Sequence, residues 1–450
     1  MLSFPEEVNT VLRTLRAAKR DAYVVGGCVR DLLLGRTPSD YDVATDAPPE
    51  EVLRLFGDAA RPTGLRHGTV TVSGVEITTY RTDGAYADHR HPDFVRFSVR
   101  PEDDLGRRDF TVNAMAMDGE GKLLDLFGGR EDLQNKLIRA VGRAEDRFEE
   151  DALRMLRALR FAAVLGFSLA PETEAALYEK RGLLQTVAGE RVREELSRLL
   201  LGDGAEEVLL RYPAVLGVVL PEILPSVGFS HHNPHHCYDV WEHSVRALAA
   251  LPRDPVLRWT MLLHDLGKPF VAVYDEEAGR LRFAGHQKKS RELAAPILAR
   301  LHFSREDAER ILRLIECHDT VIEPDTAGAR RLLRRFGERD AYAILELRRA
   351  DNLAQHPDYH GFQQTVRDCR ACVDGVLKEG LCFSLAGLAL RGDELLPLGY
   401  RGAEIGRALN ALLDAVVEEK IPNEKTALLA WLADKQKKAP AAGDGRNAKG

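Results

Sequence analysis

The chain has 450 residues, of which 44% are hydrophobic and 30% are charged, and its formal net charge is −7. This length predicts about three domains of ordinary globular composition. No apolar run is long enough to cross a bilayer, the first residues lack the features of a signal peptide, and six scattered cysteines argue against a disulfide framework. We therefore expect a cytoplasmic protein that makes no membrane contact. The net charge also argues against a surface coated with nucleic-acid-binding cations.

Residues 1–140 mix short strands with short helices, which indicates an α+β head of limited size. Residues 28–35 (CVRDLLLG) predict a short helix that ends at a glycine. Strands are predicted by apolar or alternating runs at residues 22–25, 40–45, 69–81 and 93–99.

From residue 141 onward the apolar residues recur at helical spacing, with breaks mainly at glycine and proline. We divide this all-α part into a neck (141–220), a third domain (221–375) and a helical tail (376–434). The final segment, 435–450, carries five cations against one anion and is poor in large apolar residues, so we expect it to be disordered.

A double glycine and two aspartates mark a candidate site in the head. Gly26 and Gly27 lie between an apolar strand and a helix, where backbone N–H groups can approach a phosphate. Asp40 and Asp42 are two positions apart in a predicted strand, so both carboxylates point to one face. Carboxylate oxygens held together suit Mg²⁺. The alternative for this spacing alone is a solvated edge strand.

Asp151 and Arg154 are three positions apart on a predicted helix, and they should share a face. Cytosine and adenine both present an amine donor beside a ring nitrogen acceptor, which a carboxylate and a guanidinium match. This pair is suited to accept CTP and ATP and to reject UTP and GTP. The alternative is an ordinary surface ion pair. Arg157 and Arg160 continue the face and are expected to meet the triphosphate or an RNA backbone.

The glycine pair followed by Arg30, Asp31 and the two aspartates resembles the signature of polymerase-β-like nucleotidyltransferases. Further segments follow in the order found in class II tRNA nucleotidyltransferases, the CCA-adding enzymes: RRDFTVNAMA (107–116), DLFGGREDL (125–133), EDALRMLRALRF (150–161) and GERVREEL (189–196). The resemblance is dense over residues 20–215 and weaker in the tail. It implies that Asp40 and Asp42 are catalytic and hold Mg²⁺. It also implies nucleotide-binding roles for Gly26, Gly27, Arg30, Arg107, Arg108, Asp109, Asn113, Asp151, Arg154, Arg157 and Arg160.

A second candidate site lies in the third domain. His243, the pair His264-Asp265, and Asp351 resemble the ligand set of HD-domain phosphohydrolases, which implies a divalent transition metal. His286 and His318 fall where binuclear members have further ligands. For any one of these histidines, the alternative is a structural histidine in the core or on the surface.

Two basic features bear on RNA binding. Arg330, Arg331, Arg334 and Arg335 form a local basic patch, which predicts either phosphate contact or a solvated helix face. The helical tail is expected to bind tRNA because it resembles the family's tail.

The resemblance implies template-independent addition of C, C and A to the 3′ end of tRNA from CTP and ATP, with an HD domain that hydrolyses phosphate esters. The segment 79–97 resembles the flexible loop of full CCA-adding enzymes. An enzyme that adds only A and a poly(A) polymerase remain alternatives. An alarmone synthetase/hydrolase normally has the opposite domain order, and an RNA-binding module without activity would not need paired carboxylates. The sequence does not reveal the oligomeric state.

Overall fold

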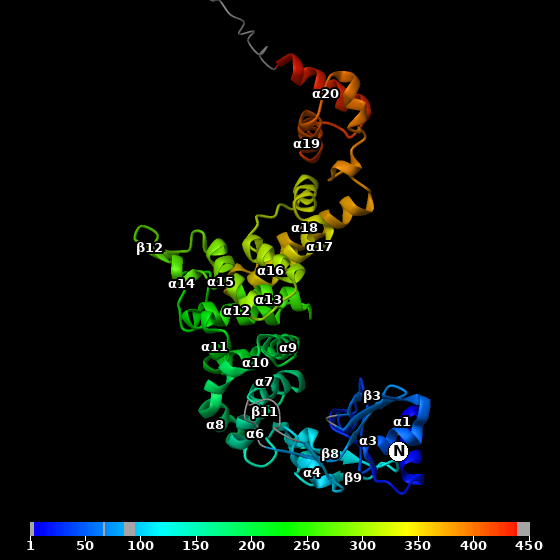
Figure 1. Cartoon of the computed structure of the whole chain (residues 1–450). Helices are drawn as coiled ribbons and strands as arrows, with labels where there is room; N and C mark the ends of the chain where they lie inside the picture. Colours follow the sequence, from blue (N-terminus) through cyan, green and yellow to red (C-terminus); the bar gives the residue numbers. More distant parts are fainter. Residues whose placement is uncertain (1–3, 66–67, 85–94, 439–450) are drawn as a thin grey trace, which may run out of the picture.

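The structure is a computed structural model that describes residues 4–65, 68–84 and 95–438. The chain is elongated and curved, with a sheet-containing head at one end and helices along the rest (Figure 1). This confirms the predicted fold class, an α+β head followed by all-α parts. Below, the head, the neck, the HD domain (221–375) and the tail are the segments within the predicted boundaries.

The head is built on a seven-stranded sheet with the order β3-β4-β5-β2-β1-β8-β9. Strand β1 pairs antiparallel with β2 and β8, and β2 pairs parallel with β5. The strands are β1 (Ala22–Val25), β2 (Asp42–Thr45), β3 (Ala60–Gly64), β4 (Thr69–Val72), β5 (Val75–Thr79), β8 (Met115–Met117) and β9 (Leu123–Asp125). The head helices are α1 (Glu6–Ala17), α2 (Gly27–Leu33), α3 (Pro49–Phe56), α4 (Pro101–Gly106), the 3-10 helix η3 (Thr111–Asn113) and α5 (Gly129–Gln134).

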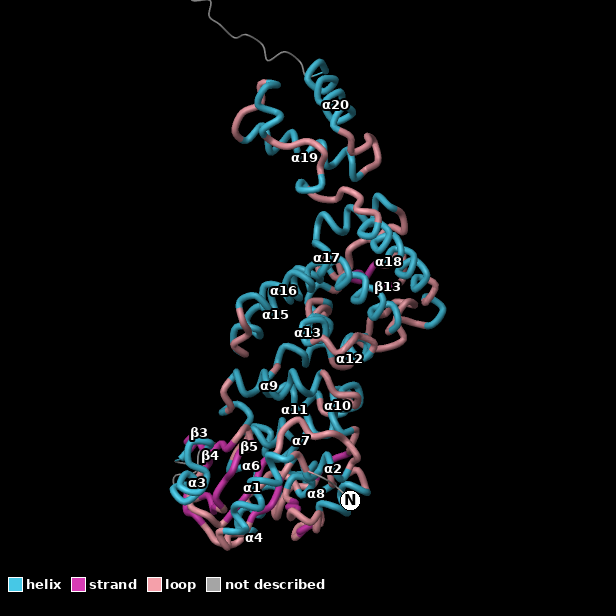
Figure 2. The backbone as a smooth tube through the Cα atoms, turned by 90° about the vertical axis from the view of Figure 1, so that its right-hand side faces the viewer, coloured by secondary structure: helices cyan, strands magenta, loops and turns pink. Residues whose placement is uncertain are grey.

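Helix α1 covers one face of this sheet together with α3 (Figure 2). Its buried residues recur at a helical spacing, and Glu6 and Glu7 in the first turn suit the positive end of the helix dipole. The opposite face carries a smaller apolar cluster to which Leu105 of α4 contributes. Because strand side chains alternate, Val24 enters the first cluster and Val25 the second.

Strands β6 (Arg81–Asp83) and β7 (Val95–Phe97) form a separate antiparallel pair. The predicted flexible loop 79–97 includes both strands. Its central residues, 85–94, lie outside the described part of the chain.

The neck consists of short packed helices, with α7 against α9 at its centre. A parallel strand pair, β10 (Leu137–Ile138) with β11 (Ser168–Leu169), connects the end of the head to the neck. The neck helices are α6 (Ala144–Glu150), α7 (Leu153–Leu165), α8 (Pro171–Lys180), α9 (Gly189–Leu200), α10 (Ala205–Arg211) and α11 (Pro213–Val219).

The HD domain and the tail are almost entirely helical, apart from the hairpin of β12 (Val273–Asp275) and β13 (Arg280–Arg282). Helix α17 changes direction at Gly337, where φ is 72°. Helix α20 continues to Lys438, so the prediction of disorder from residue 435 is wrong for 435–438, and residues 439–450 are not described. The helices are α12 (Val240–Ala249), α13 (Pro255–Leu263), α14 (Lys268–Val271), α15 (His286–Arg300), α16 (Arg305–Cys317), α17 (Thr326–Leu353), α18 (Phe362–Lys378), α19 (Ala403–Val417) and α20 (Lys425–Lys438).

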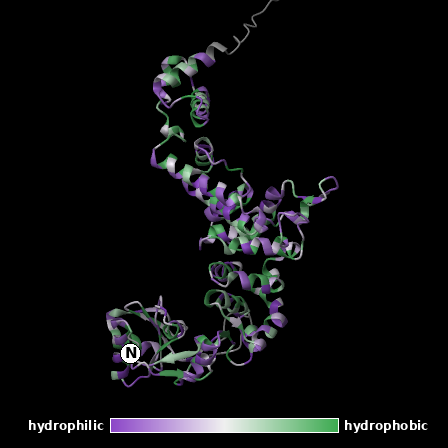
Figure 3. Cartoon of the chain, turned by 180° about the vertical axis from the view of Figure 1, so that it is seen from behind, coloured by the Kyte–Doolittle hydropathy of each residue, from purple (hydrophilic) through white to green (hydrophobic). Residues whose placement is uncertain are grey.

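Hydrophilic and hydrophobic residues are interspersed along the helices (Figure 3). Among the described residues, none of the helices combines the length and the apolar character that crossing a bilayer requires.

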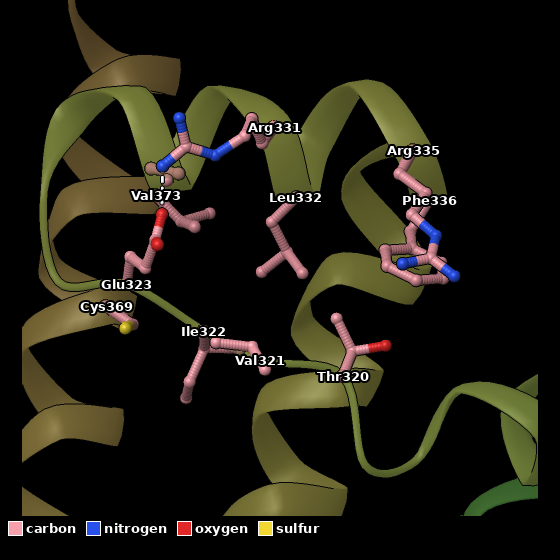
Figure 4. A pocket seen from close by; sticks show the side chains of 12 residues that line it. Thr320, Val321, Ile322, Glu323, Arg331, Leu332, Arg335, Phe336, Cys369 and Val373 are labelled. Atoms are coloured by element: carbon pink, nitrogen blue, oxygen red, sulfur yellow. Dashed lines mark hydrogen bonds and ion pairs between the residues drawn. The ribbon is translucent and has the colours of Figure 1, made fainter. Parts of the chain in front are cut away.

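Three of the four arginines of the basic patch on α17 join the HD domain to the tail, a role that was not predicted. Arg330 donates to the carbonyl oxygen of Val416 at 2.9 Å, Arg331 pairs with Glu418 at 2.9 Å, and Arg334 pairs with Asp414. Arg331 also pairs with Glu323 at the rim of a small, mainly apolar cavity of about 200 Å³ (Figure 4). These arginines interact with the C-terminal half of α19 and the residues after it, so they position the tail.

We predict that Gly129→Ala destabilises the head, because a Cβ at this position would lie 2.3 Å from the carbonyl oxygen of Thr111. Thr111 is the first residue of η3, so its displacement would also move Asn113 at the end of η3. We expect a loss of about 1–3 kcal/mol of unfolding free energy, measured by urea denaturation. Gly375→Ala is the control, since a Cβ there meets nothing within 4 Å inside α18. Equal stability of the two variants would contradict this packing argument.

Candidate functional site

A polar cavity of about 560 Å³ lies between the head and the neck. Every residue predicted for the nucleotidyltransferase site lines it except Gly26, which precedes Gly27 at its edge. The predicted residues that line it are Gly27, Arg30, Asp40, Asp42, Arg107, Arg108, Asp109, Asn113, Asp151, Arg154, Arg157 and Arg160. Residues far apart in the sequence are therefore brought together as predicted.

Asp42 is the first residue of β2, and Asp40 lies two residues before the strand, so the prediction that both aspartates belong to the strand is wrong for Asp40. Both side chains nevertheless line the cavity. Burial and the neighbouring charge of Asp40 raise the pKa of Asp42 to about 6. Neither carboxylate forms a salt bridge with a described residue. The charge of Arg108 only partly offsets this repulsion, so two nearby carboxylates that repel each other and form no salt bridge among the described residues fit a bound cation.

The turn at Gly26 brings backbone close to arginine. Gly26 has φ 83°, and a Cβ there would lie 2.6 Å from Nη1 of Arg108. Only glycine fits both the backbone conformation and this space. Helix α2 begins immediately afterwards, and its Arg30 donates to Oδ1 of Asn113 at 2.6 Å. The turn thus places backbone N–H groups and two guanidinium groups on one side of the cavity.

The buried carboxylate of Asp109 connects the head to the neck. Oδ2 of Asp109 lies 2.6 Å from Nη2 of Arg157 on α7, and Oδ1 accepts from its own neighbour Phe110 and from Asn113. Burial opposes ionisation of Asp109, but the charge of Arg157 outweighs it and lowers the pKa of Asp109. Asp109 therefore braces the cavity wall as well as lining it.

Asp151 and Arg154 line the cavity, but the prediction that they share one helix is wrong. Asp151 is extended, with φ −139°, between α6 and α7, and its Oδ1 accepts from the backbone of Leu153. Its other oxygen pairs with Arg191 of α9 at 2.9 Å, whereas Arg154 pairs with Glu150 at 2.6 Å. The carboxylate and the guanidinium are thus oriented by different partners.

Several cavity residues were not predicted as site residues. The ring of Phe161 lies under three guanidinium groups, with that of Arg160 at 4.1 Å from the ring centroid. Asp104 is buried beneath the cavity and pairs with Arg107 at 2.7 Å and with Arg108 at 3.2 Å. Phe161 continues the motif around Arg157, so its place in that motif was the available signal. The further unpredicted lining residues are Ser39, Leu153, Arg191 and Arg198.

In the HD domain, five helices bring the predicted metal ligands together. His243 of α12, His264 and Asp265 after α13 form one group whose ligand atoms lie within 4.8 Å of one another. Nε2 of His243 is 2.9 Å from Oδ1 of Asp351, which places this residue of α17 beside the group. The predicted set is therefore assembled in one buried region.

A second group shares Asp265 with the first. Asp265, His286 and His318 again hold their ligand atoms within 4.8 Å of one another. Nε2 of His286 lies 3.4 Å from Oδ1 of Asp265 and 3.3 Å from Nε2 of His318. A single carboxylate thus lies between two sets of imidazole nitrogens.

The ring orientation of these histidines also fits metal ligation. Nδ1 of His264, of His286 and of His318 lies 2.7–2.9 Å from the carbonyl oxygen three residues earlier. A Nδ1–H donor in each contact leaves the Nε2 lone pair free to coordinate. Nε2 of His264 and Oδ1 of Asp265 are buried without a hydrogen-bond partner among the described residues.

The negative charges of Asp265 and Asp351 favour a cation in this region. Burial acts against a charged imidazole, but Asp265 and Asp351 outweigh it and raise the pKa of His264 to about 9. At His318, burial prevails and lowers the pKa to about 3. Nζ of Lys268 lies 2.6 Å from Oδ2 of Asp265, so one further cation already faces the shared carboxylate.

A polar cavity of about 750 Å³ opens onto these groups through Asp351, His286 and His318. The histidine-rich segment 231–236 before α12 contributes His236 to the lining of this cavity. The ring of His236 stacks on that of buried His231, with 3.7 Å between ring centroids. Arg280, Arg282 and Arg348 also line it, and none of them was predicted.

Comparison with family models agrees with this division of the chain. Residues 22–139 match the Poly A polymerase head domain, residues 166–225 match the probable RNA and SrmB-binding site of polymerase A, and residues 235–354 match the HD domain. The head and its cavity thus define a nucleotidyltransferase.

The relatives specify the family. The CCA-adding enzyme of Lactobacillus helveticus is 35% identical over 94% of this chain and 96% of its own length, and that of Bacillus subtilis is 34% identical over the same shares. The crystal structure of the Bacillus stearothermophilus CCA-adding enzyme in complex with CTP is 31% identical, with a TM-score of 0.70 over 96% of this chain and 97% of that one. This chain belongs to the CCA-adding enzyme family, as the sequence motifs predicted.

We predict that Asp265→Asn weakens metal binding at both groups of the HD domain by at least about tenfold, because both lose the carboxylate that they share. His318→Gln should weaken binding at one group only. The measurement is metal content per chain after loading with Mn²⁺ and dialysis. His302→Gln, on the exposed side of the loop after α15, is the control. Unchanged metal content in Asp265→Asn would rule out a shared ligand.

Proposed function

We propose that this protein adds C, C and A to the 3′ end of tRNA, using CTP and ATP without a nucleic-acid template. The observation that carries the proposal is the cavity in which the Asp40–Asp42 pair faces an array of arginines across the joint between head and neck. Membership of the CCA-adding enzyme family and the CTP complex of the Bacillus stearothermophilus relative support it.

The residues of this cavity have complementary tasks in the proposal. Asp40 and Asp42 would hold Mg²⁺, which supplies charge neutralisation at the reacting phosphate when it is bound. The turn at Gly26 and Gly27 offers backbone N–H groups to the triphosphate. Arg30 and the arginines of α7 add positive charge, so the triphosphate is held with its α-phosphate toward the aspartates and an RNA 3′-hydroxyl.

Base selection is assigned to Asp151 and Arg154. The ion pair with Arg191 fixes one side of the Asp151 carboxylate, and Glu150 holds Arg154. A carboxylate oriented in this way accepts the exocyclic amine of cytosine or adenine and repels the carbonyl that uracil and guanine carry instead. Because side chains of the protein and not an RNA template present these groups, the choice is made by the protein.

The HD domain is proposed to hydrolyse a phosphate ester at the second cavity. His243, His264, Asp265, Asp351, His286 and His318 would hold divalent transition metal ions, which supply a nucleophilic hydroxide from water when bound. In the balanced reaction the oxygen of water bonds to phosphorus, one ester P–O bond breaks, and the leaving alcohol takes the proton. Lys268 and Arg348 are placed to bind the phosphate oxygens.

Purified protein should extend tRNA that lacks its 3′ end when CTP and ATP are supplied, and it should incorporate neither UTP nor GTP. Supplying tRNA ending before C, after one C and after two C residues, with one labelled nucleotide at a time, separates full addition from addition of A alone. Failure to incorporate C would leave the A-adding enzyme as the function.

We predict that Asp40→Asn or Asp42→Asn lowers nucleotide incorporation at least about 10³-fold, since each removes a charged metal ligand at the reacting phosphate. Initial rates with labelled CTP are the measurement. Asp58→Asn changes an exposed aspartate of the same domain that does not line the cavity, and it should keep the full rate. Full activity of both site variants would exclude the proposed role of the pair.

We predict that Asp151→Ala relaxes the rejection of UTP by about one order of magnitude, as expected for loss of one discriminating contact. Arg191→Gln should act in the same direction more weakly, because it releases the side chain of Asp151. The CTP-to-UTP ratio of kcat/KM in primer extension reports both effects. Arg193→Gln, on α9 but outside the cavity lining, is the control. A ratio unaffected by Asp151→Ala would remove this residue from base selection.

A further inference from the structure

A group of large apolar side chains is exposed at the entrance of the HD cavity. Phe270 of α14 is 51% exposed, and Val273 and Tyr274 of β12 are 67% and 58% exposed. The hairpin that carries two of them projects from the body of the HD domain (Figure 1). Val273 and Tyr274 are consecutive strand residues and point to opposite faces of the hairpin, so Phe270 and Tyr274 are the exposed rings of this apolar patch. Exposed apolar side chains that gather on a folded protein often mark a contact surface.

This patch is continuous with the cavity that opens onto the metal ligands. Tyr274 lies directly opposite Leu281 in the antiparallel register, so both side chains lie on one face of the hairpin. Leu281 lines the cavity. Phe270 belongs to α14, the short helix that begins at Lys268, whose Nζ contacts the shared carboxylate of Asp265. The ring of Tyr274 therefore shares a hairpin face with a cavity residue, and the ring of Phe270 is exposed on the helix that supplies Lys268 to the cavity.

The charge around the entrance specifies the chemistry of the occupant. Lys268, Arg280, Arg282 and Arg348 all line the cavity. Arg282 pairs with Asp275 and Arg348 pairs with Asp319, but Arg280 forms no salt bridge with any described residue. Arginines beside exposed aromatic rings suit single-stranded nucleic acid, because the backbone meets the cations and the bases stack on the rings. A free phosphate ester would use the cations alone, and a protein partner would have no need of an unpaired cation beside the rings.

We propose that Phe270 and the hairpin residue Tyr274 form a stacking surface for the last nucleotides of a single-stranded RNA, whose terminal phosphate enters the HD cavity beside Arg280. The proposal rests on the proposed phosphohydrolase function and names its substrate class as an RNA end. Tyr274 supplies a ring for one base, and Phe270 supplies another closer to the metal ligands. Stacking of this kind tolerates any base sequence, because every base has an aromatic face.

The test uses the full chain in EDTA, so that binding is observed without turnover. The probe is a hexanucleotide RNA with a 3′-phosphate and 2-aminopurine as its penultimate base, whose fluorescence falls when it stacks. We expect Tyr274→Leu and Phe270→Leu each to weaken binding about tenfold and to reduce the quenching, while Tyr274→Phe retains both. Val321→Ala is the control, because this side chain is 80% exposed in the same domain and lies outside the HD cavity.

Leucine keeps the apolar character of the patch and removes only the ring. If Tyr274→Leu binds the RNA and quenches its fluorescence as the unsubstituted chain does, the stacking surface is excluded and an aliphatic contact with a protein remains. A mononucleotide 3′-phosphate that binds as tightly as the hexanucleotide would also overturn the proposal. Thermal melting of each variant verifies its fold.

The hydrolase function is tested separately by hydrolysis of p-nitrophenyl phosphate by the unsubstituted chain with Mn²⁺. Absence of hydrolysis overturns that function as proposed here, whereas a loss of RNA binding in the leucine variants would still establish the stacking surface. If the chain hydrolyses p-nitrophenyl phosphate but binds the RNA equally well without the rings, the hydrolase function stands and the stacking surface is excluded. The two proposals are thereby distinguished.

Discussion

The ion pair between buried Asp109 and half-buried Arg157 is the contact on which the nucleotidyltransferase cavity depends. Asp109 follows α4 of the head, Arg157 belongs to the central helix α7 of the neck, and their charged atoms are 2.6 Å apart. Removing Arg157 would leave the buried carboxylate of Asp109 without its ion-pair partner, which is costly in a protein interior. The pair therefore holds the aspartates of β2 and the arginines of α7 on facing walls of one cavity.

Around this pair, most of the arginines that line the cavity are themselves held by acidic or aromatic partners. Asp104 positions Arg107 and Arg108 from below, and Phe161 underlies the guanidinium groups of α7. Such partners reduce the side-chain entropy that a bound triphosphate would otherwise have to remove. The site is consequently organised before the nucleotide arrives, and its positive charge is concentrated where the aspartates face it.

The sequence predicted the cavity residues well because their motifs place chemistry at fixed local spacing. The glycine turn, the two aspartates and the RRDFTVN segment each act within a few residues. The alternating pattern predicted a strand from residue 40, whereas β2 begins at Asp42. Asp151 was misplaced on a helix because its side chain caps the backbone of Leu153, which helical periodicity does not reveal. Its partner Arg191 is 40 residues away, and the arginines of α17 contact α19 across about twice that separation. Pairings over such distances are set by the packing of whole helices, so spacing alone does not show them.

The HD ligands follow a local rule that the sequence contains but that becomes apparent only in the fold. Three of their histidines turn Nδ1 toward the carbonyl oxygen three residues earlier, two of them where a helix ends. This contact uses a carbonyl group that the helix end leaves free and directs Nε2 toward Asp265. Helix termination and ligand orientation are thus achieved by the same side chain.

The separation of the two cavities has a consequence for the order of events on one RNA molecule. The cavities have no lining residue in common, and the helices of the neck lie between the head and the HD domain. An RNA terminus engaged at one of them cannot be processed simultaneously at the other. Trimming and extension by a single polypeptide would therefore be successive, with the terminus withdrawn and repositioned in between, so that each chemistry acts on an end that the other has already released.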